Sequence, residues 1–129
     1  AEYLAGTVST KALVVDQVWG AAALAALTDG ANIAVDFATG INFGGAANAP
    51  LALAGDRALS APTNLKPGQS GTLWFTASGS TRILTLTAAW KLATSLVAGP
   101  YSITTSQVFG IVYFCRSASV VYVTATMTF

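Results

Sequence analysis

The chain has 129 residues, which fits one domain with a buried core, and apolar residues make up 53% of it. Charged residues make up only 9%, against roughly 25% in ordinary soluble domains, so six basic and five acidic side chains cannot cover the surface of a solitary domain. The net charge of +1, without a basic cluster, argues against a nucleic-acid partner. We therefore expect a homo-oligomer whose subunits cover each other's uncharged surface. A small secreted domain with a Thr- and Ser-rich surface is the alternative.

The sequence pattern predicts a linker with a short helix over residues 1–30 and a β domain over residues 31–129. A Ser-Thr pair can cap a helix over residues 9–20, apolar residues follow at helical spacing, and Gly20 can end it. Residues 21–27 are rich in alanine and fit either a helix or a buried strand.

From residue 32 onward apolar and polar residues alternate with a period of two, which is typical of strands. Leu73 and Phe75, for example, lie on one face of such a run and Trp74 on the other. Turn residues such as glycine, proline and aspartate separate the runs. The pattern predicts an all-β fold, a β-sandwich or jelly-roll-like domain of about six to eight antiparallel strands.

The last two runs, residues 108–114 and 120–127, are the strongest strand predictions. Alternation places four apolar residues on one face of the final strand: Val121, Val123, Ala125 and Met127. Both faces of this strand carry little polarity, which suits a central strand or one packed against a neighbouring subunit. The longest uncharged stretch, residues 92–115, is interrupted by Gly-Pro and by many Ser and Thr residues, so we expect no membrane insertion.

Catalytic chemistry has few candidate residues in this chain. Histidine is absent, which removes the commonest general base and metal ligand. Asp29 and Asp56 stand beside glycines in predicted turns, Asp36 is expected to point outward, and the single cysteine, Cys115, lies in an apolar run that predicts a buried thiol. We expect no catalytic residues, no metal and no cofactor. A polysaccharide depolymerase that uses two carboxyl groups is the enzymatic alternative.

Three aromatic residues are the candidate ligand-binding residues. Trp74 is expected to face outward, Trp90 follows a predicted strand, and Tyr101 follows Gly99-Pro100 in a loop. Exposed rings among Thr, Asn and Gln residues can stack on the apolar face of a sugar, so these three predict a glycan platform. The alternative is that the tryptophans pack in the core or at a subunit interface.

Several motifs resemble a module of tailed-phage tail fibres and related virion appendages, including the head spikes of gene-transfer agents. They are Asn-Leu-Lys-Pro-Gly-Gln-Ser-Gly-Thr-Leu at residues 64–73, Thr-Arg-Ile-Leu-Thr-Leu at residues 81–86 and Trp-Lys at residues 90–91. The resemblance covers nearly the whole chain and is weakest between residues 92 and 108.

That resemblance implies a virion protein that forms a homotrimer, assembles with other virion proteins and binds host-surface polysaccharide. The preferred interpretation is therefore a non-enzymatic appendage subunit that contributes to glycan attachment. The alternative is a purely structural head-fibre, decoration or connector protein without a ligand of its own.

Overall fold

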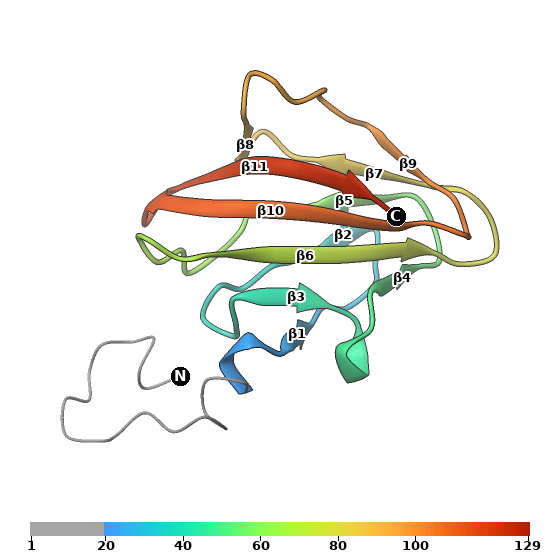
Figure 1. Ribbon diagram of the computed structural model, residues 1–129, viewed down its shortest axis with the longest axis horizontal. Coiled ribbons are helices and arrows are strands. Elements are labelled where there is room, and N and C mark those ends of the chain that lie inside the picture. The colour runs from blue at the N-terminus through green and yellow to red at the C-terminus, as the bar shows by residue number, and fades with distance from the viewer. Residues whose placement is uncertain (1–19) are drawn as a thin grey trace.

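The computed structural model describes residues 20–129, which form eleven strands in two layers (Figure 1). In chain order the elements are β1 (Leu24–Ala26), β2 (Asn32–Ile33), β3 (Asn42–Gly44), the 3-10 helix η1 (Ala46–Asn48), β4 (Leu51–Leu53), β5 (Arg57–Leu59), β6 (Ser70–Ala77), β7 (Arg82–Leu86), β8 (Trp90–Leu92), β9 (Tyr101–Ile103), β10 (Val108–Ser117) and β11 (Val120–Thr128). The all-β prediction is confirmed, but the count of six to eight strands was too low.

The larger sheet has seven strands in the order β1-β3-β6-β10-β11-β8, with β4 also pairing with β6. The smaller sheet has the order β2-β5-β7-β9. β1 lies within the segment expected to be a lead-in, so the β region begins before residue 31. The helix expected over residues 9–20 lies outside the described residues except for Gly20, and residues 20–22 are helical.

Most neighbouring strands run parallel, contrary to the antiparallel prediction. Of the nine strand pairs within residues 20–129, six are parallel and three antiparallel. The physical reason is that the chain crosses to the other sheet after most strands, for example from β5 to β6 and on to β7. Two reversals of direction make β5 and β7 parallel neighbours. Antiparallel pairing is extensive only among β6, β10 and β11.

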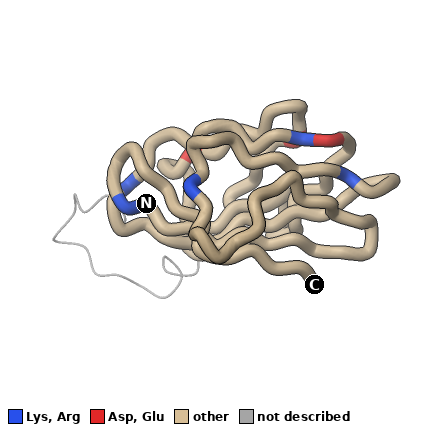
Figure 2. Tube along the Cα trace, turned by 90° about the horizontal axis from the view of Figure 1, so that it is seen from above, with Lys and Arg blue, Asp and Glu red and all other residues tan. Residues whose placement is uncertain are grey.

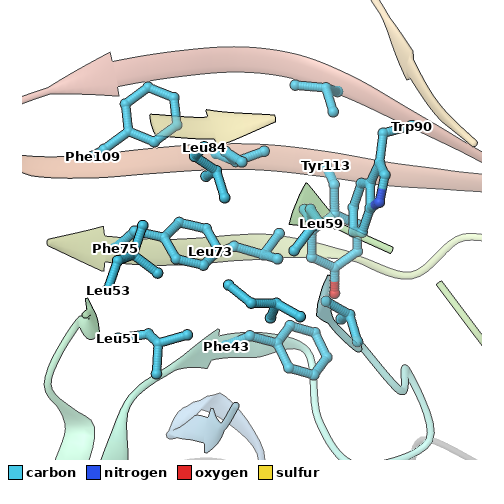
Figure 3. Packing of buried hydrophobic residues seen from close by; sticks show 14 of the residues in the cluster. Phe43, Leu51, Leu53, Leu59, Leu73, Phe75, Leu84, Trp90, Phe109 and Tyr113 are labelled. Carbon is cyan, nitrogen blue, oxygen red and sulfur yellow. The ribbon is translucent and has the colours of Figure 1, made fainter. Parts of the chain in front are cut away.

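A single core lies between the two layers, and Figure 3 shows part of it. The smaller sheet contributes one fully buried residue from each strand: Ile33, Leu59, Leu84 and Ile103. The larger sheet contributes alternate residues of its long strands, including Leu73, Phe75, Ile111 and Tyr113. The alternation predicted for β6 is therefore confirmed, with Leu73 and Phe75 inside and Trp74 on the opposite face.

The final strand departs from simple alternation because it contains a β-bulge. Tyr113 of β10 pairs with Val123, but the preceding residue Val112 pairs with Ala125, so Thr124 is an extra residue in β11. Val121 and Val123 consequently point into the core, whereas Ala125 and Met127 lie on the outer side of the sheet. The prediction that all four share one face was wrong for this reason. The prediction of a central strand is confirmed, since β11 lies between β10 and β8.

Polar side chains join the segment before β3 to the long strands. The Tyr113 hydroxyl donates to the carbonyl oxygen of Ile41 at 2.6 Å, and the Gln69 side-chain amide donates to the carbonyl oxygen of Gly40 at 2.6 Å. Asn42 Oδ1 accepts hydrogen bonds from the Thr72 main-chain N–H at 3.1 Å and the Thr72 hydroxyl at 3.0 Å. These contacts supply partners to main-chain groups that have no strand partner there.

Gly71 permits the close approach that these hydrogen bonds need. A Cβ at position 71 would overlap the carbonyl oxygen of Ile41 and would lie 3.0 Å from Asn42 Oδ1. Main-chain atoms cannot be displaced cheaply, so any residue larger than glycine pushes β3 away from β6.

Gly71→Ala should therefore lower the free energy of unfolding by about 1–3 kcal/mol, the usual cost of overpacking. Urea unfolding followed by tryptophan fluorescence measures it. Gly30→Ala is the matched control, because its Cβ would meet only a carbonyl oxygen at 3.9 Å. Equal midpoints for the two variants would contradict the steric argument.

Candidate functional site

Trp90 is a core residue and cannot serve as an exposed platform. Its side chain is 3% exposed, and its ring lies 6.0 Å from that of Phe37. The indole N–H donates to the carbonyl oxygen of Ser60 at 2.7 Å, so the one polar atom of the ring is already paired. In Figure 3, Trp90 lies at the same end of the core as Tyr113. The prediction that Trp90 binds a glycan is wrong because β8 pairs Trp90 with buried Val121.

Tyr101 also points toward the core side of its sheet. It pairs with buried Leu84, and its ring lies 5.0 Å from Phe109 of the other sheet. Its hydroxyl donates to the carbonyl oxygen of Val97 at 2.8 Å, and burial raises the pKa of the phenol. Tyr101 therefore helps to close one end of the core.

Trp74 alone of the three lies on an outward surface. It packs over Gly110 of β10, where an added Cβ would come within 2.6 Å of the indole ring, and its ring lies 6.0 Å from that of Phe129. Trp74 therefore lies on the side of the larger sheet opposite to Trp90, and Tyr101 belongs to the other sheet. The structure does not bring the three predicted residues together, so the platform expected from the sequence is not formed.

The surface around Trp74 is the most distinctive feature of the described residues. We use "outer face" for the outward-pointing residues of the three long strands and the residue after β11: Ser70, Thr72, Trp74, Thr76, Val108, Gly110, Val112, Phe114, Arg116, Tyr122, Ala125, Met127 and Phe129. The registers place them in rows, such as Trp74, Gly110 and Met127. Phe114 and Phe129 are 41% and 71% exposed. The low polarity of both sides of the last strand was a signal for this face, but the rows that β11 forms with β10 and β6 could not be predicted from the sequence.

Several polar atoms of the outer face are paired inside the chain. Trp74 Nε1 donates to the Thr72 hydroxyl at 2.8 Å, and the Thr76 hydroxyl donates to the carbonyl oxygen of Gln107 at 2.9 Å. The Tyr122 hydroxyl accepts a hydrogen bond from Arg116 at 3.2 Å. The face therefore presents carbon and few hydrogen-bonding groups to a partner.

Charge is confined to one end of the outer face. Arg116 ends the outward row of β10, and Lys91 of β8 pairs with Tyr122 at the same end. Figure 2 shows few charged residues along a trace that is mostly tan. No Asp or Glu occurs among the described residues of β6, β10 and β11.

A separate, polar groove with a volume of about 250 Å3 lies beside the ends of β1 and β2. Its polar lining consists of Thr28, Asp29, Asn32, Asp36 and Thr39. Arg57 holds Asp29 with two hydrogen bonds, from Nε at 2.7 Å and from Nη2 at 2.8 Å, and these lower the pKa of Asp29. Hydrogen bonds from the Asn64 side chain and the Ala38 main chain lower the pKa of Asp36.

Within the described part of the chain, no three His, Cys, Asp or Glu side chains come together as a metal site requires. Cys115 is fully buried, as predicted, and burial raises the pKa of its thiol. None of the helices formed by residues 20–129 is long and apolar enough to cross a membrane.

Comparisons of the chain with protein-family models, with curated proteins and with solved structures find no match.

The Asp29–Arg57 pair predicts a dependence of stability on pH. The pKa of Asp29 is lowered in the folded chain, so the pair stabilises the fold above the ordinary pKa of 3.8 and this contribution is lost as the pH falls through the lowered value. We expect Asp29→Asn to lower the thermal unfolding midpoint at neutral pH and to weaken its dependence on pH in the acidic range.

Thermal unfolding of the wild type and Asp29→Asn at neutral and acidic pH measures this effect. Glu2→Gln is the control for loss of one negative charge, since Glu2 lies outside the described fold. Parallel acid profiles for the wild type and Asp29→Asn would show that the pair contributes nothing to stability.

Proposed function

We propose that the chain is a non-enzymatic subunit of a phage-like virion appendage, a jelly-roll-like β-sandwich that works as a homo-oligomer on the particle surface. The carrying observation is the outer face, where Trp74, Phe114 and Met127 share a surface without internal charge. Exposed apolar patches of this kind mark contacts with other macromolecules. The sequence resemblance described above supports placing the contact in a virion.

The state of the groove carboxylates supports a function without catalysis. A glycosidase needs one carboxyl group with a raised pKa that can protonate the leaving group. Both carboxyl groups of the groove, Asp29 and Asp36, have lowered pKa values instead. Both are therefore ionised at neutral pH, and neither is suited to act as the acid.

Attachment to host glycan is the second candidate function, and the polar groove is its best location. The volume of the groove suits a single sugar ring, and Asp36, Asn32 and Thr39 offer groups that can bind sugar hydroxyls. The groove lacks an aromatic ring on which a sugar could stack. A structural role therefore has the stronger support.

The proposed function requires that the chain associates with itself in solution. At high micromolar protein concentration, sedimentation equilibrium of the full chain should give a mass larger than the 13.1 kDa of one chain. A mass that stays at that of one chain throughout the micromolar range would contradict the assembly function.

Location in a particle and sugar binding are tested separately. Immunogold labelling of particles purified from the source culture should mark an appendage, and label missing from every particle would contradict the virion assignment. Glycan-array binding by the wild type that is lost in Asn32→Ala and kept in the outward variant Thr85→Ala would favour the attachment function over the structural one.

A further inference from the structure

We propose that one end of the outer face binds an acidic polysaccharide, whose sugar rings pack on Phe114 and Tyr122 and whose acidic groups pair with Lys91 and Arg116. We use "basic end" for these four residues together with Ser70. The inference rests on the attachment function proposed above, whose ligand class it names, and it uses a different surface from the polar groove.

The sheet registers bring the residues of the basic end together from four strands. Phe114 of β10 pairs with Ser70 of β6 on one side and with Tyr122 of β11 on the other. Tyr122 in turn pairs with Lys91 of β8. Side chains of paired residues leave the same side of a sheet, so these four form one row on the outside. Neighbouring strands lie about 4.8 Å apart, so the row is about 14 Å long and has room for more than one sugar ring.

Two aromatic residues are neighbours in the middle of this row. Phe114 is 41% exposed, and Tyr122 is partly exposed. The apolar face of a sugar can pack on such rings, and the hydroxyl of the exposed Ser70 can bond to a sugar hydroxyl. The lining of the polar groove contains no aromatic residue. The basic end therefore offers the stacking surface that the groove lacks.

Two cations flank Tyr122. Lys91 is its partner in β8, and an Nη1 N–H of Arg116 donates to its hydroxyl at 3.2 Å. Both cations are exposed, and within residues 20–129 the one ion pair is that of Asp29 and Arg57. Lys91 and Arg116 therefore have no carboxylate partner among these residues. A carboxylate, sulfate or phosphate group on a sugar can form charge-assisted hydrogen bonds with them.

The distribution of acidic residues favours an anionic ligand at the basic end. The three acidic residues within residues 20–129 lie outside the outer face: Asp29 and Asp56 are beside Arg57, and Asp36 lines the polar groove. Asp29 and Asp36 are both ionised at neutral pH, so the groove repels an acidic sugar whereas the basic end attracts it. Two cations are too few for nucleic acid, whose binding neutralises several phosphates.

Calorimetric titration of the full chain at low salt tests the ligand class, with polygalacturonate, hyaluronate and dextran sulfate as acidic polymers. At least one of them should bind, and neutral dextran should bind about tenfold more weakly or less. Added salt should weaken the binding because it screens exposed charges. Equal binding of dextran, or no binding of any of the three, would overturn the inference. Tighter binding of single-stranded DNA than of every acidic polysaccharide would also overturn it.

Substitutions with matched controls locate the site. Lys91→Gln should weaken binding of the acidic polymer about threefold or more, whereas Arg82→Gln removes a positive charge from the smaller sheet and should leave it unchanged. Phe114→Ala should weaken it by a similar factor, whereas Phe129→Ala removes a 71% exposed ring outside the basic end and should not. Circular dichroism and thermal unfolding show that each variant folds. An equal effect in each variant and its control would rule out the basic end as the site.

Sugar binding and self-association are measured separately, so the two proposals can fail independently. If the chain associates but binds no acidic polymer, this inference fails and the assembly function stands. If it binds an acidic polymer but never associates, the assembly function fails and this inference stands. Asn32→Ala changes the polar groove and should keep the binding of the acidic polymer. Loss of binding in that variant, with unchanged binding in Lys91→Gln, would place the ligand in the groove instead.

Discussion

The fold depends on hydrogen bonds to the main chain of the segment that leads into β3. Residues 37–42 pass beside β6 and β10, and their carbonyl groups have few strand partners. Tyr113 and Gln69 donate to those carbonyl groups, Asn42 Oδ1 accepts from Thr72 of β6, and Gly71 leaves the space for this close approach. Tyr113 is fully buried, and burial raises the pKa of its hydroxyl, so this hydrogen bond is formed away from water. The first strands of the larger sheet are held to the long strands by these contacts.

The arrangement of the two sheets explains the low charge of the chain. The larger sheet is apolar on both sides: one side forms the core, and the other is the outer face. The smaller sheet turns Asn32, Thr85 and Ser102 outward, and its strand β5 supplies Arg57 of the Asp29–Arg57 pair.

The aromatic residues show how one residue type takes different roles. Trp90 and Tyr113 fill the core at one end, Tyr101 closes the other end against Phe109, and Trp74 lies flat over Gly110 on the outside. A sugar platform needs several open rings on one surface, and these rings belong to three separate places. Trp74 is the one of the three predicted residues whose ring remains outward, and its indole N–H is paired with Thr72.

The sequence by itself determined the all-β class, the alternation in β6, the burial of Cys115 and the scarcity of acid–base groups, because these follow from residue types at local spacing. Only the tertiary structure decided the parallel pairing, since glycine and proline mark a turn without showing to which sheet the chain crosses. It also decided the bulge at Thr124, which moves Ala125 and Met127 to the outside. The burial of Trp90 was decided in the same way, because the inward side of a three-residue strand is fixed by its neighbour Val121 and not by its own pattern.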